Sequence, residues 1–311
     1  MRFAVETWDP GYGSAVESLE LEPTPTEVDA GIEVPLDRWA PIPCGGDRGG
    51  PPLPDPIWFV DGVRRIDARV WISDDEGTRP GVCASVAAGA VRVAGRTAEV
   101  GEVLVARGLY TTPRGADPIR TRAGTYEVRA TGDTGPEAAH LAIHRHMTEL
   151  EARATAGAGI GDLVVVDGPL RGRSGPDVVG YVKTQHVQYL APDQQPVLAA
   201  LAPGERTPLL LLGGLQPRYS WYLRLHGART HPLACIVRCE VPAATEVARA
   251  AARATSVTAA LLRFASEPHK DARAPQNLYP IAGLEQRLRH HLGDTRLVER
   301  SLRAAGGSAH P

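Results

Sequence analysis

The feature of this sequence that most constrains its fold is a short apolar run that ends in Asp-Gly and occurs twice. The first copy spans residues 57–62 (IWFVDG) and the second spans residues 163–168 (LVVVDG). A continuous apolar run of this length predicts a strand that is buried on both faces. Each run would bring a carboxylate, Asp61 or Asp167, to the end of such a strand. An ionised aspartate is costly to bury unless it is paired, hydrogen-bonded or bound to a metal ion.

Two such strand ends, lying side by side, would hold both carboxylates within reach of one divalent cation. Magnesium and manganese prefer oxygen ligands and keep some of their bound waters. A site of this kind can activate a water molecule and neutralise charge on a scissile phosphate. The competing interpretation is a simple turn, because Asp-Gly after an apolar run is common turn chemistry. The pattern alone leaves both interpretations open.

The rest of the chain predicts a mixed α/β domain. Residues 65–72 alternate polar and apolar side chains, which is typical of a half-buried strand. Residues 81–111 hold further valine-rich strands, punctuated by glycines at 89, 95 and 108, and favour an antiparallel meander. Apolar residues at helical spacing predict helices over 136–156, 244–264 and 280–292, with a last helix from Asp294 to Ala305, and further strands are predicted over 178–184 and 220–225.

The expected organisation is one large domain. No change in composition divides residues 57–305, so we predict a single domain there. Residues 1–56 are expected to form an N-terminal segment that ends in a connection rich in proline and glycine, and residues 306–311 a disordered tail.

Composition excludes some classes of protein. With 34 basic and 36 acidic residues the net charge is −2, so any surface that binds nucleic acid must be local. The amino terminus lacks a signal pattern, and the longest apolar run is far short of the roughly 20 residues that a membrane span needs. We therefore expect a cytoplasmic protein without a membrane segment. The four cysteines are expected to be buried free thiols.

Several segments, in this order along the chain, resemble the NurA nuclease family. The second Asp-Gly run continues as Asp-Gly-Pro-Leu, which is similar to the Asp-Gly-x-Leu of that family. The segments that carry the resemblance are 59–64, 163–170, 179–184 with its lysine, 218–225 with its tyrosines, and 277–280 followed by a helix. The resemblance implies a ribonuclease-H-like mixed sheet with flanking helices, and manganese-dependent (or magnesium-dependent) exonuclease and endonuclease activity on DNA. It also implies a homodimer that works with a HerA-type hexameric ATPase in DNA-end processing.

The same resemblance implies a set of metal ligands. Asp61 and Asp167 match the family's two aspartates. The family also uses a glutamate on the helix before the second Asp-Gly, where this chain has Glu149 and Glu151. We favour Glu151, because it lies at the edge of the apolar stripe and can point inward, whereas Glu149 is expected to face solvent. On the C-terminal helix the family commonly has a histidine, and the aligned residue here is Glu285, our candidate for the fourth ligand.

Three basic residues are candidates for contacts with DNA. Lys183, one of two lysines in the chain, follows the second Asp-Gly run and would contact the scissile phosphate or orient the attacking water. Its alternative role is a charge that keeps an edge strand soluble. Arg64 and Arg65 follow Asp61 and would bind phosphate, or else form a solvent-exposed pair.

Two other functions compete with the nuclease. A zinc hydrolase would use His140 and His144, spaced i, i+4, with Glu151 on roughly the same helix face, but the His-Glu-x-x-His arrangement is missing. An adaptor for a ring ATPase would keep the fold with a decayed metal site. Three converging carboxylates would repel a nucleic-acid backbone without a metal ion between them, which argues for the nuclease.

Overall fold

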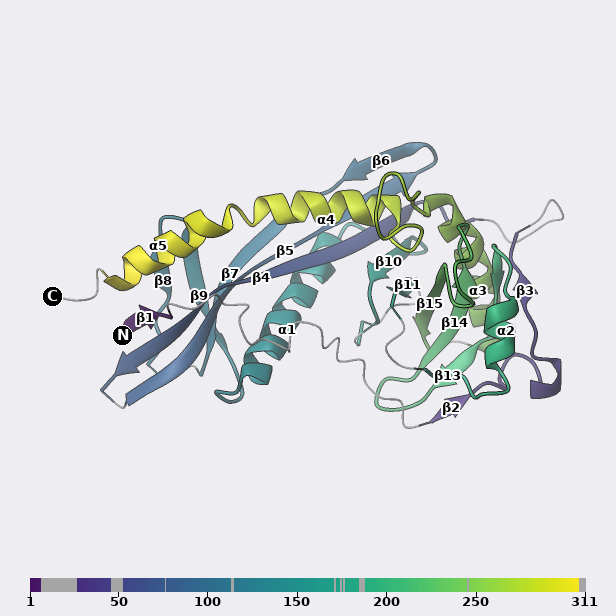
Figure 1. Cartoon of the computed structure of the whole chain (residues 1–311), viewed down its shortest axis with the longest axis horizontal. Coiled ribbons are helices and arrows are strands. Elements are labelled where there is room, and N and C mark those ends of the chain that lie inside the picture. The colour runs from purple at the N-terminus through teal and green to yellow at the C-terminus, as the bar shows by residue number, and fades with distance from the viewer. Residues whose placement is uncertain are drawn as a thin grey trace.

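The computed structural model describes residues 1–6, 27–45, 53–75, 77–112, 115–170, 172–173, 175, 177–184, 188–244 and 246–307. Fifteen strands form one mixed sheet, with helices on both of its faces (Figure 1). This confirms the mixed α/β architecture that was predicted from the alternation of strand and helix patterns. No helix in the described ranges is long and apolar enough to cross a membrane.

The predicted strands and helices lie close to their expected ranges, and the structure adds short elements that were not predicted. The strands are β1 (Arg2–Val5), β2 (Val28–Asp29), β3 (Ile42–Pro43), β4 (Ile57–Asp74), β5 (Gly77–Ala94), β6 (Thr97–Val100), β7 (Leu104–Thr111), β8 (Ile119–Thr121), β9 (Gly124–Ala130), β10 (Leu163–Asp167), β11 (Val178–Val182), β12 (Glu205–Arg206), β13 (Leu210–Leu212), β14 (Arg218–Arg224) and β15 (Ile236–Pro242). The helices are α1 (Pro136–Ala154), α2 (Gln195–Ala200), α3 (Val247–Leu261), α4 (Tyr279–His291) and α5 (Thr295–Gly307), with short 3-10 turns η2 (Leu36–Arg38) and η3 (Leu262–Phe264). The short elements that were not predicted include β1, β2, β3 and α2.

The centre of the sheet has the strand order β7-β5-β4-β10-β11. The first three strands are antiparallel, and β10 runs parallel to both β4 and β11. Helix α1 lies between the antiparallel half and β10 along the chain. This is the ribonuclease-H-like mixed sheet that we expected.

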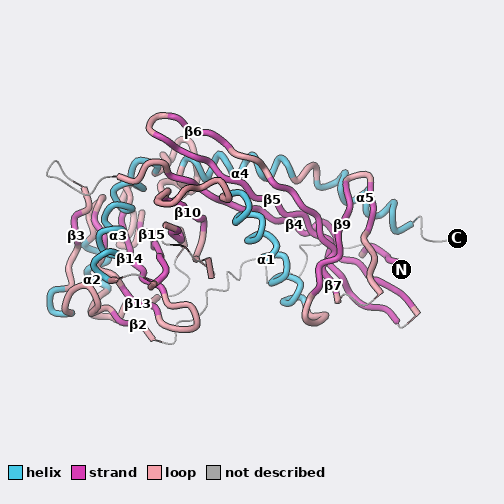
Figure 2. Tube along the Cα trace, turned by 180° about the vertical axis from the view of Figure 1, so that it is seen from behind, coloured by secondary structure: helices cyan, strands magenta, loops and turns pink. Residues whose placement is uncertain are grey.

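Helices cover the two faces of the sheet separately. Helix α1 packs through Ile143 and Met147 on one face of β5, whereas α4 packs through Leu284 and Leu288 on the other, together with Phe59 of β4. Both views show α1 and α4 on opposite sides of the long β4 and β5 (Figures 1 and 2). Side chains alternate along a strand, so each residue of β4 faces one helix or the other.

Three expected breaks in the strands were wrong. Asp61 does not end its strand, because β4 continues to Asp74. Gly89 and Gly108, expected at turns, lie inside β5 and β7. At Gly89 an added Cβ would lie 3.2 Å from a methyl group of Leu284. Packing of α4 therefore accounts for this glycine in a strand interior.

The N-terminal residues take part in the sheet. Strand β1 pairs with β4 over residues 70–73, β2 pairs with β13, and β3 pairs with β12. At the other end, α5 continues to Gly307, and residues 308–311, which belong to the expected tail, lie outside the described residues. All four cysteines are buried free thiols, as predicted.

Candidate active site

Asp61 and Asp167 meet where the parallel strands β4 and β10 separate. The register places Val60 beside Val166, and β10 ends one residue later. Both valines belong to the apolar cluster on the α1 side of the sheet. The next residue on each strand, Asp61 or Asp167, therefore points to the opposite face, toward α4. The two apolar runs thus deliver their carboxylates side by side, which is the arrangement that a shared cation site requires.

The position of Asp61 strongly disfavours its charged form. The residue is 6% exposed. Burial, and then the negative charge of Asp167, raise the pKa of Asp61 to about 8, although Lys183 acts in the opposite direction. One carboxylate oxygen accepts a hydrogen bond of 2.8 Å from the Gly62 amide. A buried carboxylate beside the half-buried carboxylate of Asp167 favours either a shared proton or a bound cation.

Lys183 belongs to this site. Its Nζ lies 2.7 Å from Oδ2 of Asp167 and 2.7 Å from Oδ1 of Asn277. Asn277 is fully buried, and its Nδ2 donates a hydrogen bond of 2.6 Å to Asp271. The ammonium group is therefore held within the site, which argues against a role in keeping an edge strand soluble. The sequence singled out the segment that contains Asn277 but gave its amide no role.

Glu285, on α4, reaches the same region but is bound to arginines. Its carboxylate lies 2.5 Å from Nη2 of Arg273 and 2.7 Å from Nη2 of Arg289. Burial alone would raise the pKa of Glu285, but the hydrogen bond and charge of Arg273 hold it below the usual value. Its negative charge contributes to the raised pKa of Asp61. Glu285 is therefore close enough to act on the aspartates electrostatically.

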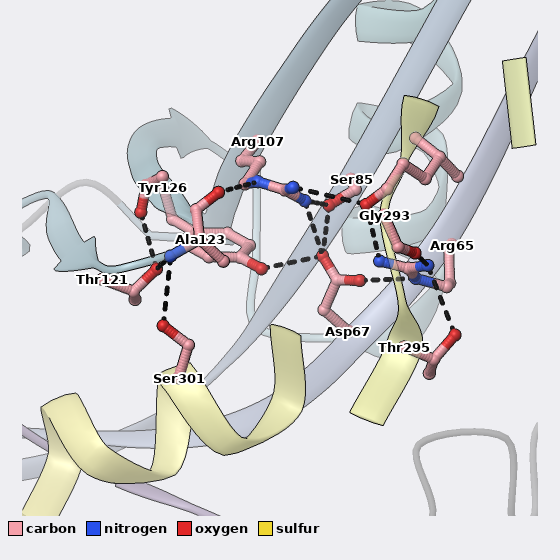
Figure 3. Close-up of polar contacts among 12 residues, drawn as sticks. Arg65, Asp67, Ser85, Arg107, Thr121, Ala123, Tyr126, Gly293, Thr295 and Ser301 are labelled. Atoms are coloured by element: carbon pink, nitrogen blue, oxygen red, sulfur yellow. Dashed lines mark hydrogen bonds and ion pairs between the residues drawn. The ribbon is translucent and has the colours of Figure 1, made fainter. Parts of the chain in front are cut away.

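A clamp of charged side chains holds the carboxyl end of α4 against the sheet (Figure 3). Asp67, whose side chain is fully buried, accepts a hydrogen bond of 2.7 Å from Arg65. The guanidinium of Arg65 in turn donates to the carbonyl oxygens of Gly293 (2.6 Å) and Leu292 (3.1 Å), and Arg107 donates to Leu292 (3.3 Å). Cations at a helix carboxyl end are favourable.

This clamp changes the interpretation of the arginine pair. Arg65, a predicted phosphate ligand, is occupied by Asp67 and by α4, so we assign it a structural role. Arg64 points to the other face of β4 and lines the groove described below.

Glu151, the predicted third ligand, is not brought together with the aspartates. It lies on the α1 face of the sheet, where it is 3% exposed and forms an ion pair with Arg173. A Cβ built on Gly62 would lie only 2.5 Å from Oε1 of Glu151. Because Gly62 and Asp61 face opposite sides of β4, the two carboxylates are on opposite sides too. Glu149 is exposed and pairs with Arg129 at 3.4 Å.

We predict that Glu151→Gln affects stability more than metal binding. The substitution leaves Arg173, whose side chain is 12% exposed, without a charged partner, which costs about 3 kcal/mol in comparable buried pairs. Urea unfolding should show this loss, while the affinity for Mn²⁺ in the folded range stays within about threefold of the wild type. A variant of normal stability that has lost Mn²⁺ affinity would instead make Glu151 a ligand.

A groove of about 1120 Å³ runs from the aspartates along the edge of β4, past Asp61 to Asp67. Its walls are α1, through His140 and Ile143, and the α4–α5 region, through a series of residues from Glu285 to Glu299. The edge is open because β10 pairs with residues 57–60 and β1 with residues 70–73, and no other described strand pairs in between. The groove therefore gives an extended ligand access to the aspartates.

The donor set fits a hard cation held by two carboxylates and water. Asp61 and Asp167 supply oxygen ligands on adjacent strands, as Mg²⁺ and Mn²⁺ prefer. In the described part of the chain, no three histidine, cysteine, aspartate or glutamate side chains form a group that could hold a metal ion. His140 and His144, whose Nε2 atoms lie 3.0 Å apart, therefore have no third such side chain beside them among the described residues.

One comparison with known proteins identifies the predicted family. The family model described as the NurA domain matches residues 71–289, a range that includes Asp167 and Glu285 and begins after Asp61. A search of curated proteins gives no match. The crystal structure of the NurA nuclease from Sulfolobus solfataricus is similar at 11% identity, with a TM-score of 0.48, over 86% of this chain and 88% of that one. Because the family model covers more than half of the sequence, this chain belongs to the NurA family.

Proposed function

We propose that this protein is a metal-dependent DNA nuclease whose cation is held by Asp61 and Asp167. Membership of the NurA nuclease family supports the nuclease class. The observation that carries the metal is the pair of carboxylates at the split between β4 and β10, where burial and mutual repulsion raise the pKa of Asp61 to about 8. A divalent cation would relieve that repulsion and lower the pKa of Asp61.

Each residue has a distinct task in this proposal. When bound, Mn²⁺ or Mg²⁺ would polarise the scissile phosphate and lower the pKa of a bound water. Asp61 and Asp167 supply the negative charge that holds the cation. Lys183 pairs with Asp167 and orients its carboxylate, and its remaining N–H group is available to a phosphate oxygen. Asn277 fixes Lys183 by accepting its second hydrogen bond.

The biological setting of the proposal comes from the family resemblance. It includes DNA-end processing, a homodimer and a HerA-type hexameric ATPase as partner. DNA as the substrate is consistent with the open groove that leads to the aspartates. The proposal includes both exonuclease and endonuclease cleavage.

The test is degradation of end-labelled linear DNA by the purified protein with Mn²⁺, with Mg²⁺ and with chelator. Loss of label that requires a divalent cation supports the proposal. Cleavage that continues in chelator overturns the metal dependence. If the protein cuts DNA neither alone nor with the ATPase added, it is an adaptor with a decayed site.

Glu285→Gln is expected to lower cleavage by about tenfold, less than the loss of either aspartate. Because Glu285 is paired with Arg273 and Arg289, its charge would act on the cation only from a distance, and the substitution removes that smaller effect. The Mn²⁺ concentration that gives half-maximal rate should rise. If Glu285→Gln cleaves at the wild-type rate with the same Mn²⁺ dependence, Glu285 has no role in the site.

A further inference from the structure

The outer face of α4 and α5 carries an excess of exposed arginines. Arg287, Arg289, Arg296 and Arg300 are all exposed. The acidic residues of the two helices are Glu285 and Glu299, and both are half-buried. In a chain whose net charge is −2, such a local concentration of positive charge is a candidate binding surface for an anion.

The two helix carboxylates already have partners. Glu285 pairs with Arg289, and Glu299 pairs with Arg303 at 2.7 Å. The ion pairs found among the described residues include neither Arg296 nor Arg300. These two residues are four positions apart on one helix, where like charges destabilise the helix. An anion bound between them would offset this repulsion.

The position of these residues points to the substrate of the proposed site. Thr295 and Glu299 line the groove that begins at the aspartates. Arg296 and Arg300 follow them directly in sequence, each about 100° further round α5, so they lie on the exposed helix surface next to the groove wall. We call these two residues the arginine rim.

The rim is held in place relative to the site. The clamp formed by Arg65, Asp67 and Arg107 fixes the junction between α4 and α5 (Figure 3). Further along, the Ala123 amide donates a hydrogen bond of 3.1 Å to the Ser301 hydroxyl, which ties α5 to the β8–β9 turn. A rigid scaffold reduces the entropy lost when a flexible ligand binds.

We propose that the arginine rim binds backbone phosphates of the DNA strand whose scissile phosphate lies at Asp61 and Asp167. This inference rests on the proposed nuclease function and adds a substrate track to it. From Glu285 to Arg300 is roughly 22 Å along the helices, if the rise is about 1.5 Å per residue throughout. At about 3.4 Å per nucleotide of one strand, the rim lies about six nucleotides from the site.

The first experiment measures DNA binding in chelator, by anisotropy of a labelled 20-mer, single-stranded and duplex. Arg296→Ala/Arg300→Ala is compared with Arg249→Ala/Arg263→Ala, which removes the same charge from exposed positions on α3 and η3. Figure 1 shows α3 at the opposite end of the molecule from α5. Alanine substitutions at exposed helix positions change stability little, so both variants should fold.

The rim variant is expected to lose about tenfold in affinity at low salt, and the control variant less than about twofold. The slope of log affinity against log salt should decrease by about 1.4 for the single strand, or about 1.8 for the duplex, if two phosphate contacts are lost. With Mn²⁺, the advantage of a 20-mer over a four-nucleotide substrate in kcat/KM should shrink in the rim variant.

The outcomes separate this inference from the proposed function. If the wild type cuts and binds DNA but the rim variant keeps its affinity and salt slope, the rim does not bind DNA and the nuclease stands. If the wild type neither binds nor cuts DNA, both fail. If the rim variant changes the mass of the protein in solution but not its affinity for DNA, the rim is an interface between copies and the inference is overturned.

Discussion

Asp61→Asn and Asp167→Asn are each expected to lower the cleavage of linear DNA by roughly a thousandfold or more. The substitution keeps the size of the side chain and removes one of the two negative charges that face each other where β4 and β10 separate. At Asp167 it also removes the charged partner of Lys183. The measurement is the initial rate with saturating Mn²⁺, for proteins whose circular dichroism matches the wild type.

The matched control is Asp37→Asn, an exposed aspartate in η2, which should cleave at the wild-type rate. If both site variants cut DNA as fast as the control, the assignment of the cation to this carboxylate pair is wrong. If one variant is inactive and the other is not, the active variant's aspartate is not required for cleavage.

Asp61→Asn is also expected to make the protein more stable at alkaline pH in chelator. The pKa of Asp61 is about 8 in the folded protein, whereas an aspartate without burial or charged neighbours has a pKa of 3.8. Between these values the folded state holds a proton that the unfolded state has lost, so stability decreases as the pH rises from about 4 to about 8. Asparagine removes that decrease, and the expected gain at pH 8.5 is of the order of 2–5 kcal/mol.

Urea unfolding at pH 4.5 and pH 8.5 measures this effect. The difference between Asp61→Asn and the wild type should be small at the lower pH and large at the higher one. A variant that is equally stable or less stable than the wild type at pH 8.5 would show that Asp61 is ionised in the metal-free protein. If Asp61→Asn gains stability and loses cleavage, then Asp61 lowers the stability of the fold and is needed for activity.

The meeting of Asp61 and Asp167 could be predicted from the sequence because it depends on local patterns. Two apolar runs that both end in Asp-Gly predict two buried strands, and buried strands of this kind are usually parallel neighbours. In that arrangement the residues that follow the runs fall together. The limits of α4 followed in the same way from Pro280 and Gly293, which favour the start and the stop of a helix.

The environment of Glu151 could not be predicted in this way. Helical periodicity tells which side of α1 faces the sheet, and Glu151 does lie at that buried side. It does not tell which face of the sheet the helix covers. Because α1 packs opposite α4, the predicted ligand is separated from the aspartates by β4 and meets Arg173 instead.

Contacts between residues that are distant in sequence could not be predicted from the sequence pattern either. The Asp67 carboxylate pairs with Arg65 and accepts hydrogen bonds from the hydroxyls of Ser85 and Tyr126. It also lies within ion-pair distance of Arg107. Alternation predicted a half-buried strand around Asp67 but gave no partner for its carboxylate, since pairing depends on the register of strands that are far apart in the chain. Lys183 and Asn277, separated by 94 positions, are a second example.

The most direct test of the metal centre is calorimetric titration of Mn²⁺ into the wild type, Asp61→Asn, Asp167→Asn and Glu151→Gln at pH 8. We predict that the wild type and Glu151→Gln bind Mn²⁺ with similar affinity, whereas each aspartate variant loses at least about tenfold in affinity for Mn²⁺. Binding that survives in both aspartate variants, or that is lost in a folded Glu151→Gln, would contradict a cation held between β4 and β10.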